Sequence, residues 1–371
     1  MAEVAPRDRD WMATALALAR RGVIGTAPNP RVGCVLVRDG VILSSGWHEQ
    51  AGHAHAEAHA LQCLPDGQTA EGATAYVTLE PCSHHGQTPP CSDALIRAGI
   101  TRCVVGMTDP NPKVSGQGID RMRDAGIDVI VLHDFAEGRW LNRRFLSAME
   151  RGRPWVVLKC AVSADGFMDP LRAPGEIGSK AITSPALRRL THTWRAEEGA
   201  ILVGAGTVVT DNPRLDVREA LGPSPLRVVF DPHGRTSAHA QVYRAPGSAL
   251  VLGGPDGLPA QVVRLPIGAQ MAIPAALNAL HQREIRSVLV EGGADTLRRF
   301  IEGGHWDELR ICRSAIQLGD GMKAPDWPSE DLTMLRGWHP FGTDHIEYRI
   351  HPDSARWVGT CPPPTISVAF P

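Results

Sequence analysis

One short segment combines residue types that can bind a metal and move a proton. Residues 53–59 read HAHAEAH, and a strand-like run ending at Glu80 leads into PCSHHGQTPPC, in which Cys82 and Cys91 are nine residues apart. Zinc favours imidazole and thiolate ligands, and a catalytic zinc site has three protein ligands and one open position. One histidine together with the two cysteines would complete such a set.

The spacing selects one of the three histidines. Zinc deaminases carry His-x-Glu followed downstream by Pro-Cys, and their glutamate moves protons without binding the metal. Only His55 stands two residues before Glu57, which makes Glu57 the predicted catalytic acid/base. The predicted zinc ligands are His55, Cys82 and Cys91. Pro81 would end the strand and turn the Cys82 thiolate toward a helix N-terminus, which favours the ionised form. The alternative is that both cysteines are ordinary buried thiols.

Length and charge limit the class of protein. The 371 residues exceed the usual size of one hydrophobic core, so two domains are expected. The 40 acidic and 38 basic residues leave no basic footprint for nucleic acid or an anionic membrane. No apolar run approaches the ~20 residues of a membrane span, and the N-terminal segment lacks the apolar run of a secretory signal. Eight cysteines without a signal predict a cytoplasmic protein without a disulfide framework.

The first 150 residues carry the pattern of an α/β domain. An amphipathic N-terminal helix is expected, with Trp11, Ala15, Leu18 and Ala19 on one side. Residues 32–45 predict a hairpin with an Asp-Gly turn. Further strands are predicted at 75–80, 102–107 and 128–132, and helices at 56–64, 92–98, 117–125 and 135–149. This alternation indicates a largely parallel sheet beyond the hairpin.

A second α/β domain is predicted for residues 151–355, and the Pro-rich residues 356–371 are expected to form an extended tail. Strands are predicted at 155–163, 200–204, 226–230, 249–252, 286–293 and 308–313, and helices at 184–196, 273–282 and 294–302. Glycine turns follow two of these strands, in GAGTVV and EGG, and such turns suit a ligand with several phosphates, such as a dinucleotide. Arg195 and Arg218 are candidates for a substrate phosphate, and a solvated surface role is the alternative.

Longer stretches resemble a known family. Within residues 10–148, APNPRVGCVLV, HAE, YVTLEPCSHHGQTPPC and TDPNPKVSGQGIDRMRDAGIDV closely resemble the deaminase half of the bifunctional riboflavin-biosynthesis deaminase–reductases. Base, nucleoside and tRNA deaminases generally carry Pro-Cys-x-x-Cys instead. The resemblance implies a cytidine-deaminase-like α/β/α fold and removal of an exocyclic amine from a phosphoribosylated diaminopyrimidinone. It also places Asn29 and His84 near the substrate, although they could equally cap a turn and order a loop.

The second half resembles the reductase half of the same family. The segments are RPWVVLKCAVSADGFM, ITSPALRRLTHTWRAEEGAILVGAGTVVTDNPRLDVR and VLVEGGADTL. The resemblance implies a dihydrofolate-reductase-like fold, NADPH as cofactor, and hydride delivery to the sugar C1. Matched positions imply dinucleotide contacts by Ala161, Thr207, Asp211 and Gly293, and substrate contacts by Ser179, Arg195, Leu215, Arg218 and Glu291. Lys159 and Asp165 are both candidates for the proton donor.

The second half also departs from the family pattern. Ala181 stands where the family usually has Trp before ITS, the loop 169–180 is irregular, and residues 314–330 match only loosely. A deaminase with a structural or dimerising second domain is therefore the alternative function.

Two other classes of protein fit less well. A base-flipping editing enzyme would need a basic surface and Cys-x-x-Cys. A structural zinc protein would favour four ligands and would have no use for Glu57. The expected partner is a small-molecule substrate, without nucleic acid or membrane, and the sequence leaves a homo-oligomer open.

Overall fold

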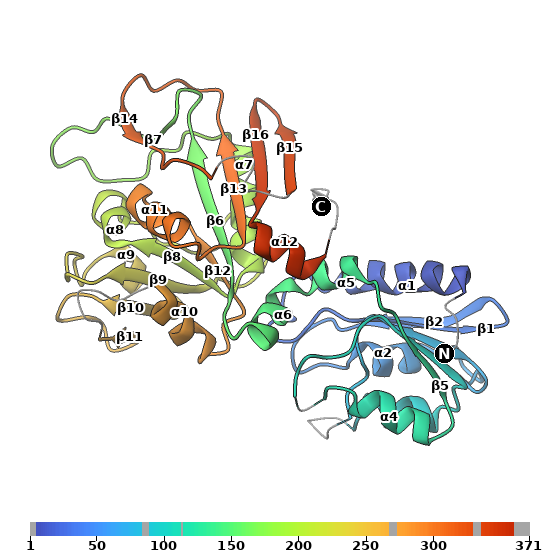
Figure 1. Cartoon of the computed structure of the whole chain (residues 1–371). Helices are drawn as coiled ribbons and strands as arrows, with labels where there is room; N and C mark the ends of the chain where they lie inside the picture. Colours follow the sequence, from blue (N-terminus) through green and yellow to red (C-terminus); the bar gives the residue numbers. More distant parts are fainter. Residues whose placement is uncertain (1–4, 84–88, 113, 267–272, 329–334, 360–371) are drawn as a thin grey trace. The chain divides into compact units, whose positions relative to one another are not determined.

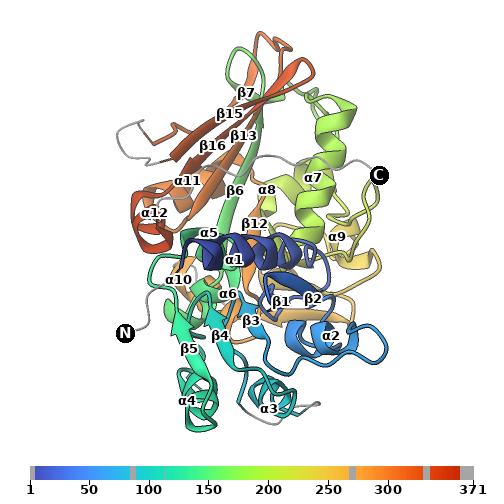
Figure 2. The ribbon, with the colours of Figure 1, turned by 90° about the vertical axis from the view of Figure 1, so that its right-hand side faces the viewer.

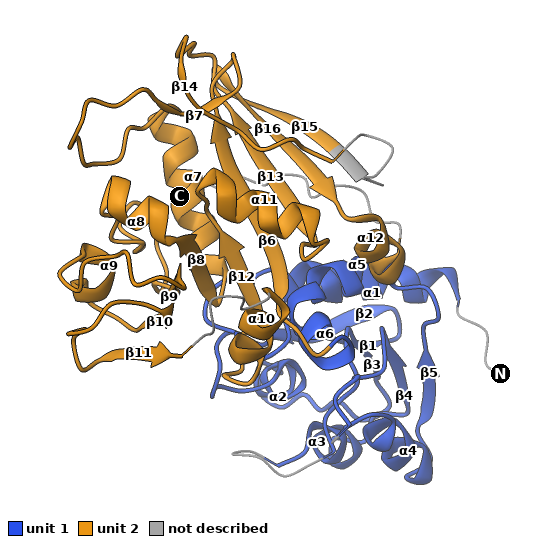
Figure 3. Cartoon of the chain, turned by 60° about the vertical axis from the view of Figure 1, so that its left-hand side comes forward, with its two compact units in different colours: residues 1–151 blue, residues 152–371 orange. Residues whose placement is uncertain are grey.

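The computed structural model describes residues 5–83, 89–112, 114–266, 273–328 and 335–359 (Figure 1). The chain divides into two compact units, residues 1–151 and residues 152–371 (Figure 3). Among the described residues, no helix combines the length and the apolar character that a membrane span requires.

Unit 1 is built around one mixed sheet with the strand order β2-β1-β3-β4-β5. Its strands are β1 (Gly33–Arg38), β2 (Val41–Trp47), β3 (Thr74–Val77), β4 (Arg102–Val105) and β5 (Asp128–Val131). Its helices are α1 (Pro6–Ala19), α2 (Ala56–Gln62), α3 (Cys91–Arg97), α4 (Gln117–Asp124), α5 (Ala136–Leu141) and α6 (Arg143–Glu150). The β1–β2 hairpin is antiparallel, and β3, β4 and β5 are parallel, so the predicted hairpin and parallel sheet are confirmed.

Helices cover both faces of this sheet (Figures 1 and 2). On one face, α1 buries Met12 and Ala15 against Val35, Tyr76 and Val104. On the other face, apolar residues of α2, α3 and α4 pack against the alternate strand positions. Because successive strand side chains point to opposite faces, the short apolar strands can supply both cores. The result is an α/β/α unit.

A buried carboxylate fastens α1 to the sheet. Asp8 is 2% exposed and accepts hydrogen bonds from both ends of the Arg102 guanidinium, at 2.7 and 2.9 Å, and from the Tyr76 hydroxyl at 2.9 Å. The bonds from Arg102 lower the pKa of Asp8 in spite of its burial. The predicted amphipathic helix is confirmed. Its buried side contains this carboxylate, Met12 and Leu16 as well as the predicted alanines, whereas Trp11 and Leu18 are only partly buried.

The helix predicted over 135–149 is two helices, α5 and α6, separated at Asn142. The Asn142 side chain accepts a hydrogen bond from the Arg31 N–H at 2.8 Å and donates one to the Arg31 carbonyl at 2.9 Å. These two bonds hold the segment that enters β1. The boundary between the two helices therefore coincides with a tertiary contact to a residue 111 positions away.

Unit 2 contains a larger sheet with the order β11-β10-β9-β8-β12-β6-β13-β16-β15 and a separate two-stranded ladder of β7 and β14. Its strands are β6 (Trp155–Val162), β7 (Phe167–Pro170), β8 (Ala200–Gly204), β9 (Leu226–Asp231), β10 (Ala249–Gly253), β11 (Val262–Leu265), β12 (Ser287–Val290), β13 (Glu308–Arg313), β14 (Gly321–Lys323), β15 (Leu335–Phe341) and β16 (Asp344–Ile350). Its helices are α7 (Pro185–Glu197), α8 (Ala205–Asp211), α9 (Gln241–Arg244), α10 (Ile273–His281), α11 (Ala294–Glu302) and α12 (Pro352–Val358). From β11 to β13 the strands are parallel, and β16 and β15 continue the sheet in antiparallel fashion.

The β15–β16 hairpin is not predicted from the sequence. The buried apolar residues of β16, Ile346, Tyr348 and Ile350, alternate with Glu347 and Arg349, which are charged and also buried. Glu347 is fully buried and accepts hydrogen bonds from Arg349 at 2.6 Å and from Arg313 of β13 at 3.0 Å. Ion pairs within β16 and with β13 therefore satisfy the face of the strand that the alternation alone would assign to solvent.

The start of the predicted extended tail is helical. Helix α12 includes residues 356–358, and its Ser354 hydroxyl donates a hydrogen bond to Asp307 at 2.6 Å. Pro352 at the first helical turn favours this start, since a proline there sacrifices no helical hydrogen bond. Residues 360–371 lie outside the described part of the chain.

Candidate functional site

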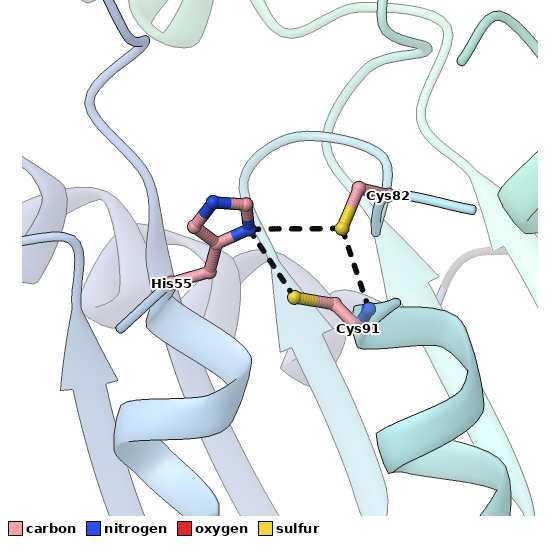
Figure 4. Close-up of side chains that lie close together, drawn as sticks. All are labelled: His55, Cys82 and Cys91. Atoms are coloured by element: carbon pink, nitrogen blue, oxygen red, sulfur yellow. Dashed lines mark hydrogen bonds between the residues drawn. The ribbon is translucent and has the colours of Figure 1, made fainter. Parts of the chain in front are cut away.

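Three side chains from separate elements converge in unit 1. His55 directly precedes α2, Cys82 lies in the segment after β3, and Cys91 is the first residue of α3. The His55 Nδ1 atom lies 3.6 Å from the Cys82 Sγ atom and 3.4 Å from the Cys91 Sγ atom (Figure 4). Among the histidine, cysteine, aspartate and glutamate side chains of the described residues, these three form the one group whose ligand atoms are close enough to bind a single metal ion.

The donor set fits zinc. With a Zn–N bond of about 2.0 Å and a Zn–S bond of about 2.3 Å, the nitrogen and sulfur ligands of a tetrahedral site are roughly 3.5 Å apart. The two nitrogen–sulfur distances of 3.6 and 3.4 Å match that geometry. Three ligands leave the fourth position for water or substrate, as in catalytic zinc sites.

The backbone around the two cysteines holds the thiol groups in place. The Cys91 N–H donates to the Cys82 Sγ atom at 3.3 Å, and the Ser92 hydroxyl and N–H both donate to the Cys82 carbonyl. The predicted meeting of the Cys82 thiolate with a helix N-terminus is thus confirmed. A hydrogen bond from the Cys91 thiol lowers the pKa of Cys82 to about 4, and the same contact raises the pKa of Cys91. A dication at this position would favour both thiolates.

Small residues bring α2, and with it Glu57, against the sheet. Ala56 and Ala60 are fully buried, and a Cβ atom on Gly46 of β2 would lie only 2.4 Å from the Ala60 nitrogen. Ala56 and Ala60, one helical turn apart, therefore form the face by which α2 approaches β2. Glu57, in the first turn of α2, is 3% exposed, and burial raises the pKa of its carboxyl to about 7.

The other two histidines of the opening segment have different surroundings. His53 is exposed. The His59 Nδ1 atom lies 2.9 Å from the Trp47 carbonyl oxygen, so this ring contacts the backbone of β2. The prediction that only His55 of the three belongs to the metal site agrees with this geometry.

His48, at the end of β2, was missed by sequence reasoning. Its Nε2 atom lies 3.2 Å from the Asn29 amide nitrogen, its Nδ1 atom lies 3.0 Å from the Ala54 carbonyl, and its ring meets the His55 ring edge-on at 5.5 Å. The structure therefore brings Asn29 to the metal site through His48. In the sequence, the only sign of this role for His48 is its position just after the predicted hairpin, a few residues before the HAHAEAH segment. His84, the other residue expected near the substrate, lies outside the described residues.

Glu80 is a second residue that sequence reasoning missed. Its carboxylate is 4% exposed and accepts hydrogen bonds from the N–H groups of Asp109, Gly116 and Gly118, at 3.2, 2.9 and 3.0 Å. A Cβ atom on Gly118 would lie 1.9 Å from the Pro81 carbonyl oxygen, so only glycine allows α4 this close. These contacts fix the segment that leads to Cys82.

Unit 2 contains a cavity of about 790 Å³, within the range of small-molecule and cofactor sites. The predicted contact residues that line it are Ala161, Ser179, Arg195, Thr207, Asp211, Arg218, Glu291 and Gly293. Leu215 is the exception, because it is 3% exposed and its side chain packs into the core beside Val203 and Val229. At the turn from β8 to α8, Gly206 leaves open space where a side chain would stand, which gives a ligand room to approach the backbone.

Two predicted substrate contacts pair with each other. Arg195 donates two hydrogen bonds to the Glu291 carboxylate, both at 2.7 Å, and a third to the Asp216 carbonyl. Burial alone would favour the neutral acid, yet the charge of Arg195 lowers the pKa of Glu291 to about 2. The pair therefore presents a charged, fixed surface to the cavity.

Arg218 is the more accessible arginine at the cavity. Its side chain is 51% exposed and contacts Asp216 at 2.9 Å, and its backbone N–H donates to His192 Nδ1 at 3.3 Å. Burial, followed by the charges of Arg195 and Arg218, lowers the pKa of His192 to about 4, so this ring is neutral near pH 7. Arg214 contacts the same Asp216 carboxylate at 2.7 Å but is not among the residues that line the cavity.

The structure separates the two candidates for the proton donor. Lys159 lines the cavity, whereas Asp165 does not. The Asp165 carboxylate accepts hydrogen bonds from the Ser163 hydroxyl at 2.6 Å and from the Gly319 N–H at 2.7 Å, and so anchors the loosely matching 314–330 loop. Met322 of that loop, Ala181, and Ser179 of the irregular loop 169–180 all line the cavity, so each of the three departures from the family pattern has a residue at the site itself.

The comparisons with known proteins cover both units. The family model described as "Cytidine and deoxycytidylate deaminase zinc-binding region" matches residues 5–107, and the one described as "RibD C-terminal domain" matches residues 154–338. The riboflavin biosynthesis protein RibD of Escherichia coli is 41% identical over 332 residues, covering 84% of this chain and 89% of the relative. The chain belongs to the RibD family. RibD of Aquifex aeolicus is 38% identical and covers 86% of this chain and 90% of its own.

Solved structures of RibD proteins are similar to this chain over nearly its whole length. The diaminohydroxyphosphoribosylaminopyrimidine deaminase/5-amino-6-(5-phosphoribosylamino)uracil reductase of Thermotoga maritima is 33% identical, with a TM-score of 0.82 and coverage of 93% of this chain and 98% of that one. RibD of Acinetobacter baumannii is 35% identical, with a TM-score of 0.81 and coverage of 93% and 99%.

Membership of the RibD family confirms the main predictions made from the sequence. The chain is a bifunctional deaminase–reductase of riboflavin biosynthesis, with zinc and NADPH as its cofactors. Unit 1 has the cytidine-deaminase-like fold and unit 2 the dihydrofolate-reductase-like fold. The alternative of a deaminase with a purely structural second domain loses support, since the match to the RibD C-terminal domain is accompanied by a ligand-sized cavity.

Removing either sulfur ligand should remove the metal. We expect the purified protein to hold about one zinc per chain, and Cys82→Ser or Cys91→Ser to lose most of it, because a serine hydroxyl is a poor ligand for zinc. His53→Ala changes an exposed histidine nearby and should keep the metal. Elemental analysis of the purified variants checks this, and full zinc content in both serine variants would contradict the ligand set.

Proposed function

We propose that unit 1 deaminates 2,5-diamino-6-(5-phosphoribosylamino)pyrimidin-4-one, and that unit 2 then reduces the ribosyl group of the product to ribityl with NADPH. The observation that carries this proposal is the convergence of His55, Cys82 and Cys91 beside the buried Glu57. The substrates are supported by the description of the Thermotoga maritima relative as a deaminase and reductase of these compounds. In this proposal residues 1–150 are the deaminase domain and residues 151–355 the reductase domain.

In the deaminase site, Glu57 is the group that moves protons. When bound, zinc supplies a Lewis acid that makes water nucleophilic near neutral pH. Deamination consumes one water and releases one ammonia, so a proton must pass from the water oxygen to the leaving nitrogen. Glu57 is shielded from solvent, lies in the first turn of α2 two residues after His55, and suits this transfer. Asn29, oriented by His48, is proposed to hydrogen-bond the pyrimidine.

In the reductase site, the cavity residues are proposed to divide between two ligands. NADPH supplies the hydride when bound. Ala161, Thr207, Asp211 and Gly293 would contact the dinucleotide, and Ser179, Arg195, Arg218 and Glu291 would contact the phosphoribosyl substrate. Leu215 can take part only through its backbone, since its side chain is in the core. Lys159 is proposed to supply the proton that balances the reduction, because it lines the cavity and Asp165 does not.

We also propose that the protein is a homo-oligomer of the cytoplasm. Val41 and Ile42, which are 63% and 41% exposed, lie on the edge strand β2, and an exposed apolar edge is a surface on which a second copy can pair. The cysteines of the described residues are all free thiols, which suits a reducing compartment. Light scattering over a range of concentrations tests the assembly, and a monomer mass throughout would refute it.

Glu57→Gln should stop deamination while leaving the metal in place. Glutamine keeps the shape of the side chain but cannot accept the proton, and a general acid–base group contributes ~10²–10⁴-fold. Ammonia release from the diaminopyrimidinone should fall by that range. Zinc content and NADPH oxidation with the already deaminated substrate should stay at wild-type levels. Near-normal ammonia release by the variant would rule out this role.

Arg218→Ala should weaken substrate binding in the reductase reaction alone. A lost charge-assisted contact with the phosphate corresponds to roughly a ten-fold or greater rise in KM for the phosphoribosyl substrate, with the KM for NADPH unchanged. Arg214→Ala is the matched control, since it removes the other arginine from Asp216 outside the cavity. Steady-state kinetics of both half-reactions provide the measurement. Equal effects of the two variants would show that Arg218 acts only through Asp216.

A further inference from the structure

The segment 171–180 follows β7 (Figure 1). Its last residues border the reductase cavity. Its two large apolar side chains, Leu171 and Ile177, are 71% and 66% exposed, so apolar burial does not hold it. At its end, however, Ser179 and Lys180 line the cavity. Polar contacts must therefore place this edge of the site.

Arg172 supplies those contacts. Its guanidinium donates to both oxygens of Asp169, at 2.5 and 2.8 Å, to Asp211 at 2.8 Å, and to the Gly178 carbonyl at 2.6 Å. The Gly178 N–H in turn donates to the Thr210 carbonyl at 3.0 Å. One side chain thus connects the end of β7, the segment 171–180 and the end of α8.

The position of Arg172 relative to the cavity indicates an indirect role. Asp169, Thr210 and Asp211 line the cavity, but Arg172 does not. Its side chain is only 12% exposed, against 18% for Asp169 and 28% for Asp211, so it lies behind the two carboxylates. Without the guanidinium, two partly desolvated carboxylates would face each other and a polyanionic ligand, which is unfavourable.

We propose that Arg172 is a positioning residue for NADPH. It holds the Asp211 carboxylate and the backbone of 178–180 in the arrangement that receives the dinucleotide, and it compensates the charge of both aspartates. This rests on the proposed contact between Asp211 and the cofactor. The planar fork of arginine, with its five donors, can meet three acceptor groups at once, whereas a lysine ammonium cannot span them.

The test is NADPH binding by the full-length protein without substrate, measured by calorimetry. Arg172→Gln should raise the Kd by about ten-fold or more, the size expected for loss of charge-assisted contacts, and Arg172→Lys should raise it nearly as much. Glu176→Gln is the matched control, because it removes an exposed ion pair with Lys180 from the same segment, and should change the Kd less than about two-fold. A wild-type Kd for Arg172→Gln, or equal effects of Arg172→Gln and Glu176→Gln, would overturn the proposal.

Two further measurements separate a positioning role from a merely structural one. Hydrogen exchange of the segment 171–180 should speed up in Arg172→Gln but not in Glu176→Gln, and the rate of deamination should stay unchanged. The KM for NADPH should rise more than the KM for the phosphoribosyl substrate, whose proposed contact Ser179 lies in the same segment. Equal rises in both reductase KM values, or a loss of deamination, would indicate general damage and overturn the proposal.

The variant Asp211→Asn tests the underlying assignment. If Asp211→Asn raises the Kd for NADPH and Arg172→Gln leaves it unchanged, the role of Arg172 is rejected and the contact by Asp211 stands. No change in either variant would reject the contact by Asp211 as well.

Discussion

Unit 1 depends on one electrostatic constraint, which is to hold two thiols, an imidazole and a carboxyl in one small, poorly solvated volume. Without a cation, the hydrogen bond between the two thiols lowers the pKa of Cys82 and raises that of Cys91, and burial raises the pKa of Glu57. A zinc ion would replace the protons of the two thiols, so that both cysteines would bind it as thiolates. Glu57 then remains as the group able to exchange a proton, and the surrounding packing serves to keep this arrangement in position.

The same principle governs unit 2, where buried charges are matched by fixed partners before any ligand arrives. The carboxylate of Glu291 is held by Arg195, and that of Asp211 by Arg172. A partly buried carboxylate is tolerated when an arginine satisfies it, and it then has a defined direction. The cavity is consequently preorganised by ion pairs that lie at its wall or just behind it, and binding need not pay to order them.

The metal site could be predicted because its information is local and chemical. Zinc accepts few ligand types, and His55, Glu57, Cys82 and Cys91 stand at spacings that a strand-to-helix connection can bring together. The alternation of strands and helices likewise predicted the parallel sheets, since that pattern repeats along the chain. His48 escaped prediction because a lone histidine at a strand end carries no such pattern.

By itself the sequence determined the chemistry of the deaminase centre, the two-unit α/β organisation and, through resemblance, the pair of reactions. Tertiary structure alone decided which polar side chains meet. It paired Arg195 with Glu291 across 96 positions, buried Glu347 with its arginines at the positions that alternate with the apolar residues of β16, and turned the Leu215 side chain into the core. The physical reason is that a charged side chain has no preferred partner along the chain. Its partner is set by which elements the packed core brings together, and only the folded arrangement contains that information.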